Sequence, residues 1–171
     1  MEAAAASLDP EAAADLGERR LQVVAEPAPG LRWQIALTAL IVAAIVWQHV
    51  PAPAVLGWLF AVLASREWRM AALRRLSQDR ARPIAQRLRA VLYWNLLIGA
   101  CNGSASLFMG WLDPTLDAVL TMILVSWGAG AVSTSSTVMP AFVAYAALLF
   151  VPTALMWVAG GTWLGLGVGA L

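Results

Sequence analysis

The sequence has no lysine, one cysteine and one histidine among its 171 residues. A single cysteine, Cys101, excludes an intrachain disulfide and a cysteine-rich metal site. The single histidine, His49, cannot complete a zinc site or a two-histidine haem site within this chain. We therefore predict no metal and no cofactor, and we expect the Cys101 thiol to be buried and inert.

Charge is also scarce. Charged residues make up 12% of the chain and hydrophobic residues 61%, whereas typical soluble domains are about 25% charged. A chain of this size could not hide so much apolar surface in water, so part of its solvent must be lipid. All eleven basic residues are arginine and none lies beyond Arg89, after which only Asp113 and Asp117 are charged. The arginines cluster between apolar stretches, which indicates a role at a membrane surface and no nucleic-acid partner.

Recognisable catalytic constellations are absent from the sequence. It has no Ser/His/Asp set, no glycine-rich phosphate loop followed by lysine, and no acidic metal cluster. Asp113 and Asp117 flank a turn and are more simply explained as helix caps. We therefore predict that the chain is not an enzyme and has no catalytic residue. Its apolar stretches also lack the Asp, Glu or Lys of a proton relay or ion-coupled carrier, which disfavours a transporter.

What the chain does have is a series of apolar stretches. They predict an all-α integral membrane protein, a bundle of five complete transmembrane helices plus a truncated sixth. Tryptophans at both ends of the first stretch fit an interfacial belt. A signal peptide is the alternative there, but a long acidic leader and a second apolar stretch directly afterwards favour an anchor. The cores of the five spans are residues 35–47, 54–64, 91–111, 118–139 and 141–158.

The predicted sixth span, residues 162–171, would rise only about 15 Å as a helix, roughly half the hydrocarbon thickness. We therefore expect this chain to belong to a longer polypeptide. A completed sixth span would lead into a domain on the cytoplasmic side.

Two regions follow from this organisation. Residues 1–30 form a cytoplasmic, alanine-rich acidic tail in which Asp9 can cap a short helix and Pro27 can end it. Residues 31–171 form the transmembrane helical domain, with 66–90 as an arginine-rich cytoplasmic helical connection that divides near 79–83. The positive-inside rule places this connection, and with it the N-terminus, in the cytoplasm.

The arginine-rich connection has two interpretations. The first is a solvated loop that only sets topology, and the second is a surface for anionic lipid headgroups. The candidates for headgroup contact are Arg74, Arg75, Arg82, Arg87 and Arg89.

Small and polar residues recur at helical spacing inside the apolar stretches. Asn95, Gly99, Asn102 and Gly103 fall on one side of the third, and Gly99–Gly103 is a GxxxG pattern for close helix packing. Asparagines inside a membrane are costly unless paired, so they should face protein or a polar cavity. The predicted helix-packing residues are Gly99, Gly103, Gly128, Gly130, Gly165 and Gly169. The predicted ligand-binding residues are Asn95, Asn102, Ser126, Ser133 and Thr134.

From about Arg82 onward, the chain contains a series of short motifs, each of which occurs once. The motifs are Arg80–Arg89, Gly99–Gly110, Asp113-Pro114, Gly128-Ala129-Gly130-Ala131, Met139-Pro140-Ala141-Phe142 and Val151-Pro152. This order resembles the bacterial membrane input domain that precedes diguanylate cyclases and hybrid sensor histidine kinases. The resemblance implies a six-helix sensory or anchoring module of the inner membrane that is usually dimeric.

Two functions follow as expectations. The first is an input module of a signalling protein, with the output domain absent from this chain. The alternative is a non-catalytic accessory or structural subunit of a larger membrane complex. The expected partners are the lipid bilayer and either a second copy of the chain or such a complex.

Overall fold

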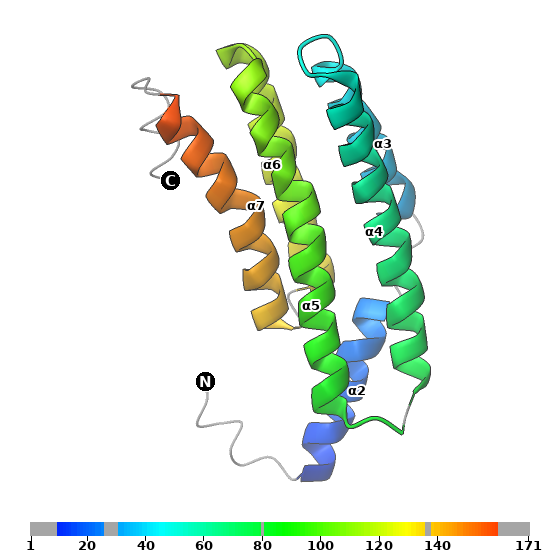
Figure 1. The fold of residues 1–171 in the computed structure, drawn as a ribbon. Coiled ribbons are helices and arrows are strands. Elements are labelled where there is room, and N and C mark those ends of the chain that lie inside the picture. Colours follow the sequence, from blue (N-terminus) through cyan, green and yellow to red (C-terminus); the bar gives the residue numbers. More distant parts are fainter. Residues whose placement is uncertain (1–9, 26–30, 80, 136–137, 161–171) are drawn as a thin grey trace.

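The structure, a computed structural model, describes residues 10–25, 31–79, 81–135 and 138–160. All regular elements of this described part are helices, and it contains no strand (Figure 1). Its elements are α2 (Pro10–Ala25), α3 (Leu31–Val46), α4 (Ala52–Gln78), α5 (Ile84–Gly103), the 3-10 helix η1 (Ser104–Trp111), α6 (Pro114–Ser135) and α7 (Met139–Ala159).

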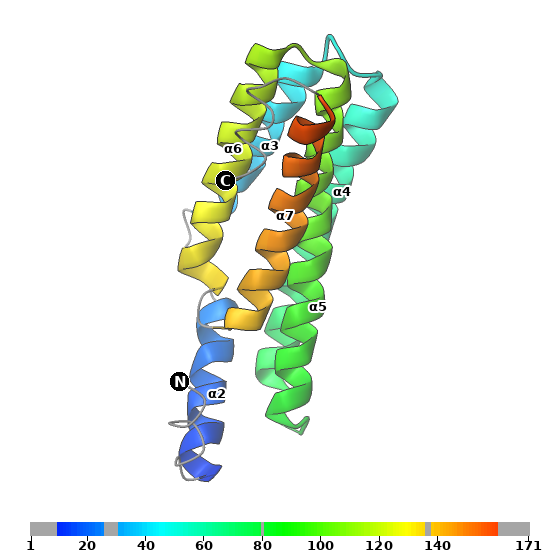
Figure 2. The same cartoon turned by 90° about the vertical axis from the view of Figure 1, so that its left-hand side faces the viewer.

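Helices α3 to α7 run side by side, and α2 lies at the end of the bundle where α4 turns into α5 (Figures 1 and 2). The α-helices from α3 to α7 reverse direction one after another, so α4 is antiparallel to α5, whereas α5 and α7 run the same way. The most extensive contact joins α5 to α7, and α2 packs against both α4 and α5.

Prolines and one aspartate define the helix ends. Pro51 precedes α4 and Pro83 precedes α5, which confirms the predicted division of the arginine-rich connection near residues 79–83. Oδ1 of Asp113 accepts hydrogen bonds from the backbone N–H groups of Thr115 (2.8 Å) and Leu116 (3.0 Å). The predicted capping role of Asp113 is thereby confirmed.

The larger core is aromatic. The Trp58 ring of α4 stacks on Trp127 of α6 at a centroid distance of 6.4 Å, and Phe108 of η1 meets Trp58 edge-on at 5.6 Å. Trp58 Nε1 also donates to the Cys101 carbonyl of α5 at 3.1 Å. A single indole therefore ties α4 to three other elements and fixes the register between α4 and α5.

A smaller core lies at the opposite end of the bundle. It gathers one fully buried residue from each of four helices, and these are Leu21 of α2, Leu73 of α4, Val91 of α5 and Ala141 of α7. Gly17 brings the backbone of α2 close to α5, because a Cβ at this position would lie 2.8 Å from Cγ1 of Ile84. The N-terminal helix is thus docked on the bundle.

The prediction of five complete transmembrane helices and a truncated sixth was wrong. In the described part of the chain only two helices are long and apolar enough to cross a membrane, Pro114–Val132 within α6 and Met139–Ala159, which is α7. Residues 161–171, the predicted sixth span, lie outside the described residues. By length and composition, two candidate spans indicate an association with membrane.

The other three stretches fall short for separate reasons. The apolar part of α3, Trp33–Val46, rises only about 21 Å, against about 30 Å of hydrocarbon. Helix α4 is longer, but Arg66 and Arg69 interrupt its second half. The first turns of helix α5 contain Arg87 and Arg89, and the helix ends at Gly103.

The end of α5 has a local cause. Ser104 Oγ donates to the Cys101 carbonyl at 2.8 Å, and Ser106 Oγ donates to the Gly103 carbonyl at 2.7 Å. Both bonds reach back three residues, the spacing of a 3-10 helix. The hydroxyls therefore favour the tighter helix η1 over a continuation of α5.

Candidate functional site: a buried polar cluster between α4, α5 and α7

The polar face of α5 is turned into the protein. Asn95, Gly99, Asn102 and Gly103 are all buried. A Cβ at Gly99 would lie 2.9 Å from the carbonyl oxygen of Tyr145 and 3.1 Å from its Cα. The backbone of α7 therefore packs directly on α5, as small residues permit.

Gly103 makes a second close approach to the backbone of α7, at a place where α7 lacks one of its helical hydrogen bonds. Pro152 lies inside α7 and has no N–H, so the Leu148 carbonyl four residues earlier loses its helical donor. A Cβ at Gly103 would lie 3.0 Å from the Leu148 carbonyl carbon and would clash with its oxygen. The glycine thus leaves room for a carbonyl that the proline has freed.

One side-chain hydrogen bond crosses the same interface. Asn102 Nδ2 donates to the Tyr145 hydroxyl at 3.1 Å, and the two residues are 5% and 6% exposed. The predicted polar partner of Asn102 is therefore a tyrosine of α7, which sequence spacing alone does not reveal because the two residues are 43 positions apart.

Two buried donors on this side of the bundle have no hydrogen-bond partner. They are Nδ2 of Asn95, a residue that is 3% exposed, and Nε of Arg69 in α4. Burial lowers the pKa of the Arg69 guanidinium, and the Tyr145 hydroxyl, which is close enough to interact with it electrostatically, opposes this effect. We call Arg69, Asn95, Asn102 and Tyr145 the polar cluster.

Of the remaining predicted ligand residues, Ser126 does not join the polar cluster. Ser126 is exposed on α6, and its hydroxyl donates to the Met122 carbonyl of its own helix at 2.8 Å. The side chains of Ser133 and Thr134 lie outside the described residues. The structure therefore brings Asn95 and Asn102 to one face and places Ser126 elsewhere.

The predicted packing glycines of α6 differ from one another. Gly128 lies against the Phe150 ring of α7, whereas a Cβ at Gly130 would meet nothing within 4 Å. Gly165 and Gly169 lie outside the described residues.

Four of the five predicted headgroup arginines are exposed at the end of the bundle that carries α2. They are Arg74, Arg75, Arg82 and Arg89. Of these, Arg82 pairs through Nε with Oδ2 of Asp79 at 2.8 Å.

Arg87 is different, because it points into the protein. It is 3% exposed, and both of its terminal nitrogens bond the Glu18 carboxylate of α2, one of them at 3.0 Å. Its Nε donates to the Arg82 carbonyl at 3.2 Å. Arg87 therefore holds the N-terminal helix and is not available to a lipid headgroup. The partner Glu18 was not predicted, since the pairing spans 69 positions.

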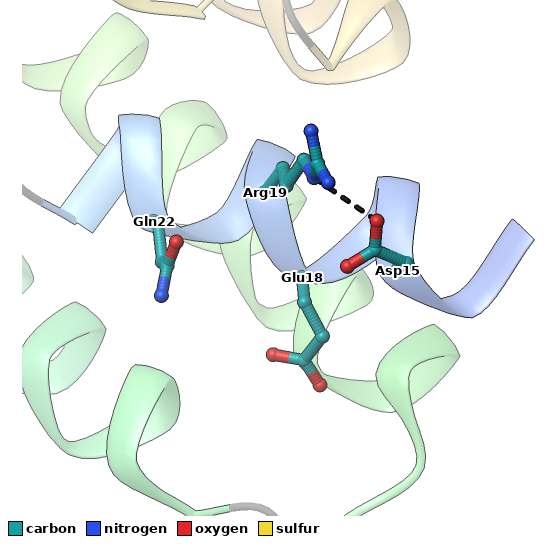
Figure 3. A pocket seen from close by; sticks show the side chains of 4 residues that line it. All are labelled: Asp15, Glu18, Arg19 and Gln22. Atoms are coloured by element: carbon teal, nitrogen blue, oxygen red, sulfur yellow. Dashed lines mark ion pairs between the residues drawn. The ribbon is translucent and has the colours of Figure 1, made fainter. Parts of the chain in front are cut away.

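A depression of about 400 Å³ on α2 is lined by Asp15, Glu18, Arg19 and Gln22, whose side chains are drawn in Figure 3. Arg19 pairs with Asp15 at 3.0 Å, and both side chains are largely exposed. Exposed ion pairs of this kind contribute little to stability, and the Glu18 carboxylate is already bonded to Arg87. We interpret the depression as solvated surface.

Within the described ranges, no three His, Cys, Asp or Glu side chains come together in a way that could hold a metal ion. The chain matches no protein-family model, no curated protein and no solved structure. The features of the described chain that bear on function are the exposed apolar helices, the polar cluster and the docked helix α2.

Proposed function

We propose that this protein is a membrane-embedded, non-catalytic helical module that serves as the sensory or anchoring input part of a bacterial signalling protein. Its cytoplasmic output domain would lie outside the present chain. The observation that carries the membrane part of this proposal is the exposure of α6 and α7. Of the residues in their most apolar windows, only 22% and 28% are buried.

These exposed faces are apolar. Met122 of α6 is 70% exposed and Leu155 of α7 is 62% exposed. A core helix of a soluble protein would bury such side chains, and soluble monomers rarely expose continuous apolar faces. Lipid surroundings remove the cost of this exposure.

The charges support one orientation. Arg74, Arg75 and Arg89 are exposed at the end of the bundle that carries α2, and Asp113 is exposed at the other end (Figure 1). By the positive-inside rule the arginine-rich end faces the cytoplasm of an inner-membrane protein. Helix α2 would then lie on the cytoplasmic side, where it could contact an output domain.

The signalling part rests on the interface between α5 and α7. The backbones of α5 and α7 are in contact at Gly99 and Gly103. The distance between the two helices therefore cannot decrease by small steps without a steric clash. Such interfaces favour discrete packing arrangements, and a change at the polar cluster would be passed along α7.

Cysteine labelling tests the membrane topology. In a Cys101→Ser background, Gln78→Cys places a thiol at the arginine-rich end and Thr115→Cys at the opposite end. A membrane-impermeant maleimide should label only Thr115→Cys in spheroplasts and only Gln78→Cys in inside-out vesicles. Labelling of both positions from one side, or loss of the protein from the membrane fraction after carbonate washing, contradicts the proposal.

The intact mass of the native polypeptide, taken from its own membrane, tests the signalling part. A mass well above 18.2 kDa, with a catalytic domain in the added portion, supports an input module. A mass near this value, together with copurification in a larger complex, supports the accessory subunit instead. Crosslinking in the same membrane shows whether the module is a homodimer.

A further inference from the structure

The polar cluster contains a half-buried cation, Arg69, whose Nε is fully buried and which has no counter-ion among the described residues. Arg69 makes no ion pair with any carboxylate in the described part of the chain, where Glu18 pairs with Arg87 and Asp79 pairs with Arg82. A buried charge is strongly unfavourable unless an opposite charge and hydrogen bonds compensate it. Among the described residues, the guanidinium of Arg69 therefore has no partner of negative charge.

The register of α4 and α5 brings Arg69 and Asn95 to one level. The hydrogen bond from Trp58 to Cys101 aligns these two residues. The two helices are antiparallel, so a step of seven residues from Trp58 toward the end of α4 matches a step of seven residues from Cys101 toward the start of α5. The first step reaches Ser65, and the second reaches the turn that contains Asn95. Arg69 follows Ser65 by one helical turn, and a helical side chain leans toward the N-terminus of its own helix. Its guanidinium accordingly returns to the level of Asn95.

Helix α7 packs against the same face of α5. Gly99, one turn after Asn95, lies against the backbone of Tyr145, and the Tyr145 hydroxyl interacts electrostatically with Arg69. The donors of Arg69 and Asn95 that lack a partner thus lie on α4 and α5, and the buried face of α5 that carries Asn95 packs against α7. One acceptor with two oxygens could satisfy both, since guanidinium groups bind oxyanions in a bidentate manner.

We propose that Arg69 and Asn95 form a binding site for a single phosphate-type oxyanion between α4, α5 and α7. The phosphate could belong to a lipid headgroup or be free in solution. This proposal does not depend on the signalling role, because it concerns only the unmet charge and hydrogen bonds of the bundle. It places bound phosphate beside Gly99 and Tyr145, where it would stabilise the packing of α7 on α5.

Thermal unfolding of the full chain in a phosphate-free maltoside detergent tests this site. Inorganic phosphate and a short-chain phosphatidylglycerol are added separately, with chloride at matched ionic strength as the control for screening. A specific ligand at about one hundred times its Kd should raise Tm by roughly 5–10 °C. A rise with phosphate identifies a free ion, and a rise with the lipid alone identifies a headgroup.

Variants then locate the effect. Arg69→Gln should abolish the rise in Tm, whereas Arg74→Gln, on an exposed arginine of the same helix, should leave it unchanged. Equal loss in both variants would indicate binding to the arginine-rich surface and would overturn the proposal. The absence of any rise above the chloride control in the native chain would overturn it too.

A second variant covers the case in which Arg69→Gln does not fold. Asn95→Asp keeps the size of the side chain and supplies a carboxylate at the level of Arg69. We expect Asn95→Asp to be at least as stable as the native chain and to lose its response to phosphate, because the internal carboxylate replaces the ligand. If Asn95→Asp lowers Tm and retains the response, Asn95 and Arg69 do not share a site and the proposal fails.

Discussion

The two faces of α5 are built in contrasting ways. Toward α7 the helix presents glycines, and the contact is between backbones at Gly99 and Gly103. Toward α4 it presents the Cys101 carbonyl to the large indole of Trp58, which also stacks on Trp127. The helices α5 and α7 lie close together because the contacting residues have no side chain. The position of α5 relative to α4 is instead determined by one bulky indole and its hydrogen bond.

This difference determines how each interface responds to substitution. A backbone contact offers no side chain that can rotate away, so an added methyl group must displace a helix. A side-chain contact can lose atoms and keep its helix positions. The interface between α5 and α7 should therefore be the less tolerant one.

Gly103→Val should have the largest effect. Its Cβ would clash with the Leu148 carbonyl that Pro152 leaves free, and overpacking against backbone costs about 3 kcal/mol or more. We expect a large loss in the free energy of unfolding, measured by SDS titration in mixed micelles. Gly130→Ala is the matched control, because the open space there predicts no loss and a gain of up to about 1 kcal/mol from helix propensity. Equal destabilisation by both variants would remove the distinction between the two glycines.

Glu18→Gln should come next, and it tests the docking of α2. Removal of the carboxylate leaves Arg87 buried without its partner. Breaking a buried pair costs about 3–5 kcal/mol, and the partial exposure of Glu18 reduces the expected cost to about 2 kcal/mol. Amide hydrogen exchange of α2 should accelerate while that of α7 remains slow.

Asp15→Asn is the control for that variant, because its ion pair with Arg19 is exposed. We expect a change below about 0.5 kcal/mol and no faster exchange in α2. If Asp15→Asn accelerates hydrogen exchange in α2 as much as Glu18→Gln does, the docking depends on the net charge of α2 and not on the pair of Glu18 and Arg87.

Tyr145→Phe should have a smaller effect on the interface between α5 and α7. It keeps the buried ring and removes the hydroxyl that accepts from Asn102, so one buried donor is left unpaired at a cost of about 1–2 kcal/mol. The double variant with Asn102→Leu measures the coupling by a mutant cycle. A coupling near zero would show that the hydrogen bond does not stabilise the interface.

Ser126→Ala should have the smallest effect. The Ser126 hydroxyl is exposed and bonds only the Met122 carbonyl of its own helix. We expect a change within about 0.5 kcal/mol and an unchanged response to phosphate. A lost response would return Ser126 to the ligand set predicted from the sequence.

Local signals in the sequence predicted the helix ends well. Pro83 separates α4 from α5, and Asp113 caps α6 as its position before Thr115 and Leu116 suggests. These features depend on neighbours within four residues, so they can be read without knowledge of the fold. The apolar stretches were less informative, because hydropathy does not show that α5 gives way to a 3-10 helix at Ser104.

The pairings were decided by the tertiary structure. Asn95 and Asn102 were recognised as polar residues on a packed face, but Arg69 and Tyr145 were not associated with them. Likewise Arg87 was assigned to lipid headgroups, whereas it binds Glu18. Each of these contacts depends on the register between helices, and that register is set by Trp58 and by the glycines of α5 at positions far apart in the chain.

The sequence by itself determined that the chain is helical and apolar, with most of its arginines in the stretch 66–89, because composition and short-range caps act within a few residues. The helix lengths in the structure showed that, of the described helices, α6 and α7 are long and apolar enough to cross a membrane. Only the tertiary structure decided that α2 is fastened to the bundle by Glu18 and Arg87. The physical reason is range. Helix formation is governed by neighbours along the chain, whereas the partner of a buried charge depends on which helices pack together and at what level.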